Sequence, residues 1–218
     1  MEIKCLIFDC DGLMFNTEYY SRQNWLHFGK KYNLEMDEWL FEQITGAGPT
    51  HFAWVMNQRP EIKQHLEEIR ANRNPFIAKM IEKHGNINKK GLVELLTYLN
   101  ETKNYKVCIA SSSKTEYVKW MVSSIGYDYP FDAILGGDQV TNAKPDPDIF
   151  LKAAEAVQIK PENCLVLEDS KNGHLAAYRA GMHRMFIKDL VEPDDEFKQL
   201  IEYEKKDLSE VIDFLKSL

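Results

Sequence analysis

The sequence Ile-Phe-Asp-Cys-Asp-Gly at residues 7–12 decides how the rest of the chain is interpreted. It closes an apolar run at residues 3–8, broken by a single lysine, which predicts a short buried strand. Asp9 and Asp11 therefore follow a strand end directly, and Gly12 lets the chain turn away. In a parallel α/β sheet this position opens onto the ligand crevice. An Asp-Gly pair is also ordinary turn chemistry, so a functional interpretation needs support from other parts of the chain.

Composition excludes several classes of partner. The 218 residues suffice for one sizeable core with a small appended domain, and 44% hydrophobic and 28% charged residues are ordinary for a globular protein. The net charge of −7 provides no basic face for a nucleic-acid backbone. No apolar run approaches the about 20 residues that span a bilayer, and the N-terminal segment lacks the features of a secretory signal. We therefore expect a cytoplasmic monomer that binds neither nucleic acid nor membrane, with its four cysteines reduced and buried.

The hydrophobic periodicity changes along the chain. Between residues 18 and 85 every periodic segment is helical, and no strand-like alternation occurs. Beyond this region helices alternate with short apolar strands. The sequence thus predicts an α/β fold, with a doubly wound, Rossmann-like parallel sheet in a core domain of residues 1–17 and 86–218, interrupted by an all-helical cap domain of residues 18–85. Pro75 should kink or restart the last helix of this cap, because proline lacks the amide hydrogen that a helix needs.

Polar side chains also follow other predicted strands. They are the serines Ser111 and Ser112, the lysine Lys144, and the acidic pair Glu168 and Asp169. Each has a simpler interpretation: a helix cap for the serines, a solvated loop for the lysine, and a first-turn pair favoured by the helix dipole for the acids. Their joint occurrence at the carboxyl ends of strands favours one shared site around Asp9.

This set of residues suits phosphoryl transfer. A phosphate dianion is repelled by a carboxylate nucleophile, so the site must supply positive charge and hydrogen-bond donors, here Lys144 and Ser111. Asp9, Asp169 and a backbone carbonyl offer the oxygen ligands that Mg²⁺ prefers. Asp11 could protonate the leaving alkoxide and then deprotonate water, a role typically worth about 10²- to 10⁴-fold. An aspartyl-phosphate intermediate would split the reaction into two easier steps.

Together these motifs resemble those of haloacid dehalogenase superfamily hydrolases with a helical cap after the first strand, over essentially the whole chain. The motifs are Phe-Asp-Cys-Asp-Gly with Asn-Thr-Glu, Ala-Ser-Ser-Ser-Lys, Lys-Pro-Asp-Pro-Asp-Ile-Phe and Leu-Glu-Asp-Ser. The resemblance implies these roles: nucleophile for Asp9, general acid/base for Asp11, phosphate binding for Ser111, Ser112 and Lys144, and Mg²⁺ binding for Asp9, Asp11, Glu168 and Asp169. A dehalogenase would not need the second aspartate, so the resemblance favours a phosphatase.

Within this superfamily the chain is most similar to the β-phosphoglucomutase and sugar-phosphatase branch, from which it departs at three points. Asn16 stands where such proteins usually have aspartate, which removes a charge beside the site. Ser21 or its neighbour replaces the histidine of the mutases. The loop at 46–49, Gly-Ala-Gly-Pro, has no cation where the mutases carry an arginine for the distal phosphate. Since a mutase must hold two phosphates, Arg73 alone would have to replace that arginine.

We therefore expect a Mg²⁺-dependent phosphatase acting on a small phosphorylated metabolite such as a sugar phosphate, with a phosphosugar mutase as the alternative. The candidates for substrate selectivity are Thr17, Gly46, His51, Arg73 and Asn74. A solvated helix face is an equally simple interpretation of the last three.

Two further functional classes share part of this set of residues. A receiver-type signalling module also places a phosphorylatable aspartate, a hydroxyl and a lysine around Mg²⁺, but such modules are much shorter and have no helical insert. A non-catalytic phosphate-binding protein would have no use for Asp11, whose role is proton transfer.

Overall fold

The computed structural model describes residues 2–45, 47–190 and 192–218, so the predicted selectivity residue Gly46 lies outside the described residues. The chain folds as two compact units. One unit contains the residues up to Asn16 together with Ile87–Leu218, and the other contains Thr17–Asn86.

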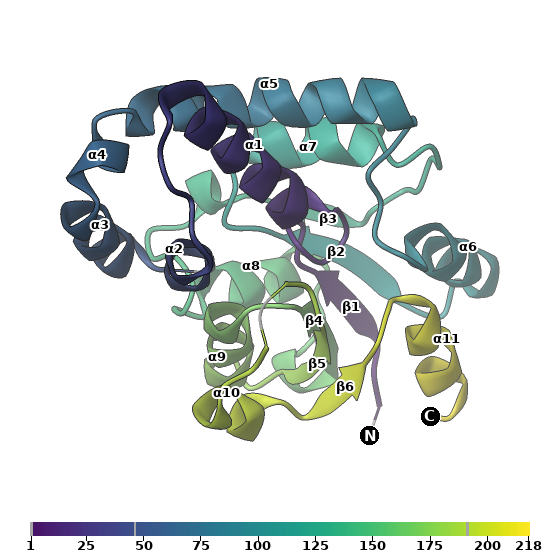
Figure 1. The fold of residues 1–218 in the computed structure, drawn as a ribbon. Helices are drawn as coiled ribbons and strands as arrows, with labels where there is room; N and C mark the ends of the chain where they lie inside the picture. The colour runs from purple at the N-terminus through teal and green to yellow at the C-terminus, as the bar shows by residue number, and fades with distance from the viewer. Residues whose placement is uncertain (1, 46, 191) are drawn as a thin grey trace. The chain divides into compact units, whose positions relative to one another are not determined.

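A six-stranded parallel sheet forms the centre of the first unit (Figure 1). Its strands are β1 (Cys5–Phe8), β2 (Lys106–Ala110), β3 (Ala133–Leu135), β4 (Cys164–Glu168), β5 (His183–Ile187) and β6 (Tyr203–Lys205). Every neighbouring pair is parallel, in the spatial order β3-β2-β1-β4-β5-β6. This is the order of a doubly wound fold, with its switch point between β1 and β4. The predicted fold class is confirmed.

Both faces of β1 are covered, which explains its continuous apolar sequence. Cys5 and Ile7 pack on one side with α8 (Asp148–Ala156) and α9 (Lys171–Arg179). Helices α6 (Leu92–Thr102) and α11 (Ser209–Lys216) contact one another and lie on the other side (Figure 1). Strand β1 is therefore fixed by β2 and β4 on its two edges and by helices on both of its faces.

Two elements of this unit have no signal in the hydrophobic pattern. They are α10 (Asp195–Leu200) and the edge strand β6. The strand is only Tyr-Glu-Lys and is not buried, so it has neither an apolar run nor alternation. The remaining elements are α7 (Thr115–Ser123) and the 3₁₀ turns at Gly137–Gln139 and Pro161–Asn163.

The second unit is entirely helical within its described residues. Its helices are α1 (Thr17–Tyr32), α2 (Glu38–Ile44), α3 (Pro49–Gln58), α4 (Pro60–Lys63) and α5 (Leu66–His84). A buried core that includes Trp25 and Ile69 joins them. The buried Asn24 amide on α1 donates to the carbonyl of Ile69 at 2.8 Å and its oxygen accepts from Asn72 at 2.7 Å, which fixes α1 against α5.

The predicted restart of a helix at Pro75 is wrong. Helix α5 continues through Pro75, and the break in this region falls earlier, at residues 64–65. Ala71, whose carbonyl loses its helical partner to the proline, is an exposed residue, so solvent can satisfy that carbonyl. The loss of one hydrogen bond on an exposed helix face is small enough to be tolerated.

All four cysteines are free and buried, as expected. Among the described residues, no helix combines the length and the apolar character that crossing a membrane requires.

Candidate active site

The loop after β1 brings Asp9, Asp11 and Asp169 to one place. The amide of Asp9 donates to the carbonyl of Leu167 at 3.0 Å, so the pairing of β1 with β4 extends to the first carboxylate. Gly12 has a φ of +83°, and a Cβ at this position would lie 2.4 Å from Oδ2 of Asp169. Only glycine therefore allows both the turn and the close approach of the Asp169 carboxylate.

Lys144 is buried at the centre of the site. Its ammonium donates to Oδ1 of Asp9 at 2.5 Å, to Oε1 of Glu168 at 2.8 Å and to the carbonyl of Ala110 at 3.1 Å. It also lies 4.6 Å from the centre of the Phe150 ring. Its side chain is only 4% exposed, so the interpretation as a solvated loop lysine is wrong. One cation thus connects the carboxyl ends of β1, β2 and β4.

The pKa values of this cluster reflect the competition between burial and charge pairing. Burial raises the pKa of Asp9 to about 7, although Lys144 acts in the opposite direction. Burial alone would lower the pKa of Lys144, but the carboxylates of Asp9 and Glu168 raise it above its usual range. Burial alone would raise the pKa of Glu168, yet Lys144 holds it below its ordinary value. At neutral pH Lys144 and Glu168 are therefore charged.

Asp11 has different partners. Oδ2 of Asp11 accepts a hydrogen bond from the Ser113 hydroxyl at 2.7 Å, and Oδ1 accepts one from the Tyr117 hydroxyl at 3.1 Å. Sequence reasoning assigned no catalytic role to Ser113 or Tyr117. Ser113 belongs to the serine motif after β2, but no pattern indicates that Tyr117, one turn into α7, reaches the loop after β1.

Ser111 and Ser112 differ in their surroundings. Ser111 is buried, its amide donates to the carbonyl of Leu135, and its hydroxyl accepts from the amide of Ser113 at 3.0 Å. Ser112 is exposed. The interpretation of the serines as a cap of α7 is wrong, because the first amide of that helix, at Thr115, donates instead to Asp138 at 2.7 Å.

The interpretation of Glu168 and Asp169 as a first-turn pair is also wrong. Glu168 is the last residue of β4, and Ser170 caps α9 by accepting from the amide of Gly173 at 3.1 Å. Oε2 of Glu168 accepts from the amide of Ser170 at 2.7 Å. A Cβ on Gly173 would lie 1.7 Å from Oε1 of Glu168, so this glycine makes room for the carboxylate that pairs with Lys144.

The oxygen atoms of this site fit Mg²⁺. The carboxylates of Asp9 and Asp169 are the hard oxygen donors that Mg²⁺ prefers, so these two residues would be the ones to hold the ion. Both carboxylate oxygens of Asp11 and of Glu168 already accept hydrogen bonds from protein groups. These two predicted ligands are therefore less available to bind a metal ion directly than Asp169 is. Over residues 2–45, 47–190 and 192–218 no preformed group of three or more His, Cys, Asp or Glu side chains could hold a metal ion.

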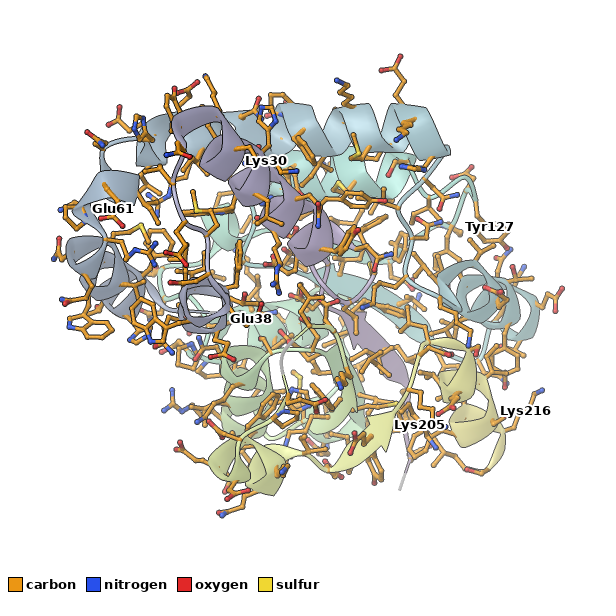
Figure 2. All side chains as sticks on the ribbon, in the orientation of Figure 1. Lys30, Glu38, Glu61, Tyr127, Lys205 and Lys216 are labelled. Atoms are coloured by element: carbon orange, nitrogen blue, oxygen red, sulfur yellow. The ribbon has the colours of Figure 1, made fainter. Side chains whose placement is uncertain are left out.

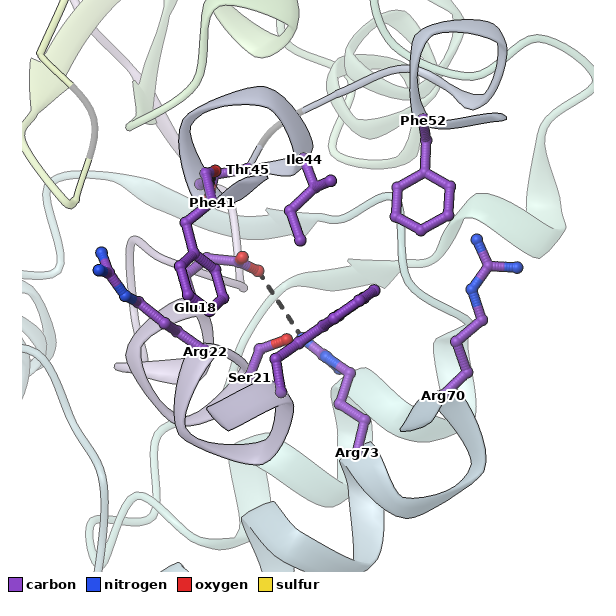
Figure 3. A pocket seen from close by; sticks show the side chains of 10 residues that line it. Glu18, Ser21, Arg22, Phe41, Ile44, Thr45, Phe52, Arg70 and Arg73 are labelled. Carbon is purple, nitrogen blue, oxygen red and sulfur yellow. Dashed lines mark hydrogen bonds and ion pairs between the residues drawn. The ribbon is translucent and has the colours of Figure 1, made fainter. Parts of the chain in front are cut away.

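The four described candidates for selectivity lie in the helical unit. Thr17 is fully buried at the start of α1. His51 is exposed, bonded to Gln43 at 3.1 Å, and Asn74 is an exposed neighbour of Arg73. Arg73 lines a cavity within this unit (Figure 3).

Arg73 is not the only arginine of this cavity. Arg22 and Arg70 line the same cavity. Their positions on α1 and α5 carry no motif, so sequence reasoning did not single them out.

Comparison with known proteins agrees with the resemblance of the motifs. A protein 33% identical over 193 residues, covering 87% of this chain and 85% of its own, is a Bacillus subtilis (strain 168) protein provisionally named phosphatase YhcW. The phosphorylated carbohydrates phosphatase of Thermotoga maritima is 27% identical over 188 residues, 84% of each chain. These names confirm the prediction of an enzyme of the phosphatase type.

Similarity of structure extends over the whole chain. The crystal structure of β-phosphoglucomutase from Clostridium difficile superposes with a TM-score of 0.75 and covers 99% of this chain and 96% of its own. Its sequence identity of 22% makes this a similarity of fold alone. The family model described as haloacid dehalogenase-like hydrolase matches residues 6–187. The chain therefore belongs to the haloacid dehalogenase-like hydrolase family.

Proposed function

We propose that this chain is a Mg²⁺-dependent phosphatase that hydrolyses a small phosphorylated carbohydrate through an aspartyl-phosphate on Asp9. The observation that carries the proposal is the different environment of the two carboxylates at one strand end. Asp9 contacts the Lys144 ammonium, whereas Asp11 contacts two neutral hydroxyl groups. The first environment suits a nucleophile that approaches an anion, and the second suits a group that gains and loses a proton.

In the first step a carboxylate oxygen of Asp9 forms a bond to phosphorus while the bond from phosphorus to the ester oxygen breaks. The leaving alkoxide takes its proton from the carboxyl group of Asp11. The products of this step are the free alcohol, an aspartyl-phosphate on Asp9 and an ionised Asp11.

In the second step Asp11 removes a proton from a water molecule, whose oxygen then bonds to phosphorus. The bond between phosphorus and Asp9 breaks, inorganic phosphate leaves, and Asp11 is protonated again for the next cycle. Ser113 and Tyr117 keep the Asp11 carboxylate in one orientation through both steps.

Positive charge is the other requirement of this reaction. Lys144 offsets the negative charge of Asp9 and Glu168, so that a phosphate can approach the nucleophile. Ser111 would donate a hydrogen bond to the phosphate. Bound at Asp9 and Asp169, Mg²⁺ would neutralise further charge on the phosphate oxygens.

The substrate class rests on a relative. The Thermotoga maritima protein, similar over 84% of this chain, is named for phosphorylated carbohydrates, and we transfer that class here. A phosphosugar mutase would share the first step but would pass the phosphoryl group to a second hydroxyl rather than to water. With β-glucose 1-phosphate and a trace of the 1,6-bisphosphate, we expect phosphate release, slow if present, and little glucose 6-phosphate. Isomerisation that outpaces phosphate release would establish the mutase instead.

The test is a screen of phosphorylated carbohydrates in the presence of Mg²⁺, with phosphate release measured for the wild type and for Asp9→Asn. We expect the substitution to abolish turnover, because an amide does not attack phosphorus. Asp213→Asn, which changes an exposed aspartate on α11 in the same way, should be as active as wild type. If Asp9→Asn kept more than about a tenth of the wild-type rate, Asp9 would not be the nucleophile.

A further inference from the structure

The chain that follows β3 packs tightly against the serine loop, residues 111–114, that follows β2. A Cβ on Gly136 would lie 2.2 Å from the amide nitrogen of Thr115. A Cβ on Gly137 would lie 2.5 Å from the carbonyl oxygen of Ser112. Any side chain larger than hydrogen would force the two segments apart, so the two glycines allow one backbone to approach the other closely.

Asp138 supplies the cap that α7 lacks locally. The N-cap residue of this helix is Lys114, whose side chain has no oxygen to accept a hydrogen bond. Oδ1 of Asp138 instead accepts from the amide of Thr115 at 2.7 Å and from its hydroxyl at 2.8 Å. The Thr115 amide lowers the pKa of Asp138, so the acceptor is a carboxylate at neutral pH. The start of α7 is thus fixed by a side chain 23 residues further along the chain.

The whole turn at Gly137–Gln139 is tied to this loop and to the core. The amide of Gly137 donates to the carbonyl of Ser113 at 2.8 Å, and the side chain of Gln139 donates to the hydroxyl of Thr115 at 2.7 Å. On the other side, Lys152 of α8 donates to the carbonyl of Gln139 at 2.7 Å. The turn therefore holds the serine loop at Ser113 and Thr115, and α8 holds the turn.

Ser113 connects the turn to the candidate active site. While its carbonyl accepts from Gly137, its amide donates to the hydroxyl of Ser111 at 3.0 Å. Its hydroxyl donates to Oδ2 of Asp11 at 2.7 Å. Hydrogen bonds weaken steeply when their geometry is distorted, so a shift of the Ser113 backbone would loosen the hold on Asp11.

We propose that Asp138 is a positioning residue: through Thr115 it keeps the serine loop in the conformation in which Ser113 orients Asp11. Asp138 is exposed and acts through the loop rather than by contacting the substrate. Its effect on catalysis rests on the proposed phosphatase function, in which Asp11 transfers protons. Its effect on the conformation of the serine loop does not rest on that function.

Two substitutions of Asp138 separate the acceptor from the charge. Asp138→Ala removes the acceptor of both hydrogen bonds from Thr115. Asp138→Asn keeps a side-chain oxygen that accepts both bonds but carries no charge. If the hydrogen bonds are what matters, the asparagine variant should behave as the wild type does.

Asp207→Ala is the matched control. Oδ1 of Asp207 accepts from the amide of Ser209 at 3.0 Å and also from its hydroxyl, at the start of α11. Asp207 also pairs with Lys90, so its removal costs at least as many contacts as removal of Asp138 does. It follows β6, whose last residue Lys205 is labelled in Figure 2, at the edge of the sheet opposite to β3.

The conformation of the serine loop is tested by amide hydrogen exchange, measured by nuclear magnetic resonance on the full-length ¹⁵N-labelled chain. In Asp138→Ala the amides of Ser113 and Gly137 should exchange at least about tenfold faster than in the wild type. In Asp138→Asn and Asp207→Ala these two rates should not change. The amide of Ile7, buried in β1, shows whether each variant is folded. Unchanged exchange at Ser113 and Gly137 in Asp138→Ala would overturn the proposal.

The effect on catalysis is tested with p-nitrophenyl phosphate. Its leaving group needs no proton, so loss of phosphate from Asp9, the step in which Asp11 activates water, should limit kcat. We expect Asp138→Ala to lower kcat about 3- to 10-fold and to leave KM unchanged. Asp138→Asn and Asp207→Ala should keep the kcat of the wild type.

A double-mutant cycle identifies the route. In a Ser113→Ala background the hydrogen bond to Asp11 is already absent, so Asp138→Ala should lower kcat less than about twofold further. A general loss of stability would instead lower kcat by the same factor in both backgrounds, and that result would overturn the proposal. If the wild type hydrolysed neither p-nitrophenyl phosphate nor any phosphorylated carbohydrate, the phosphatase function would be wrong. The exchange rates would still decide whether Asp138 holds the serine loop.

Discussion

The Tyr117 hydroxyl donates a hydrogen bond of 3.1 Å to Oδ1 of Asp11, which lies 106 residues earlier in the chain. Ser113 holds the other oxygen of the same carboxylate. Asp11 is thereby oriented by neutral donors, although Asp9, two residues away, is paired with a cation. Tyr117 would act through Asp11 as a positioning residue rather than by contacting the substrate.

Removal of this hydroxyl should slow the reaction without weakening substrate binding. For Tyr117→Phe we expect kcat to fall about 3- to 10-fold and KM to stay unchanged, because one hydrogen bond to a charged group is lost. Steady-state kinetics measures both values. Tyr178→Phe, at an exposed position on α9, is the matched control and should not change kcat. An unaltered kcat for Tyr117→Phe would show that Ser113 orients Asp11 without help.

The second carboxylate should control the loss of phosphate from the enzyme. In Asp11→Asn no base remains to activate water, so a phosphate adduct on Asp9 should accumulate when acetyl phosphate is the donor. Mass spectrometry of the intact chain detects the adduct, and the Asp9→Asn/Asp11→Asn chain, which has no nucleophile, should not form it. Rapid hydrolysis of the adduct in Asp11→Asn would contradict the assignment of Asp11 as the base.

Lys144 should be important for stability as well as for activity. Lys144→Met leaves two buried carboxylates, Asp9 and Glu168, without their cation, and we expect it to reduce the free energy of unfolding by about 3–5 kcal/mol in Mg²⁺-free buffer at pH 8. Lys216→Met at an exposed position is the control.

The pH dependence of this loss has a definite sign. Without the cation, burial raises the pKa of both carboxyl groups above their values in the unfolded chain, so the folded state binds protons more tightly. Stability is then lost as the pH rises from the unfolded pKa through the folded pKa. Chemical denaturation should therefore show a smaller loss at about pH 5.5 than at about pH 8. An equal loss at both values would mean that the carboxylates find other partners.

Gly173 should be intolerant of a methyl group. Alanine favours a helix over glycine by about 1 kcal/mol, yet a Cβ at Gly173 would overlap Glu168 and push its carboxylate away from Lys144. We expect Gly173→Ala to be net destabilising by about 1–3 kcal/mol and to lower activity. Gly48→Ala, with φ of −68° and no neighbouring atom within 4 Å of the added Cβ, should be neutral. Thermal unfolding compares the two, and a Gly173→Ala chain as stable as the wild type would show that Glu168 can move at little cost.

Metal dependence is tested by chelation. EDTA should abolish phosphate release, and added Mg²⁺ should restore it. Asp169→Asn should raise the Mg²⁺ concentration for half-maximal activity at least about tenfold, because a carboxylate binds Mg²⁺ more strongly than an amide does. Activity that survives thorough chelation would exclude the metal from the proposed mechanism.

The sequence by itself determined the class of fold and where along the chain the candidate site lies. The apolar runs that end at Asp9, Ser111 and Glu168 predict parallel strands, and parallel strands place their carboxyl ends at one edge of a sheet. The meeting of Asp9 and Glu168 at Lys144 could therefore be anticipated without knowing any distance. The helical insert could also be predicted, because the spacing of its apolar residues is helical throughout.

Only the tertiary structure decided which partner each polar side chain has. The hydrogen bond from Tyr117 to Asp11 and the gathering of Arg22 with Arg70 and Arg73 join residues that are far apart in the chain and share no motif. Periodicity reports which face of an element is buried, whereas such contacts depend on how two elements pack to within an ångström. The edge strand at Tyr203–Lys205 could not be predicted from the sequence either. It pairs with β5 through backbone hydrogen bonds, and its polar side chains give no hydrophobic pattern that would indicate this pairing.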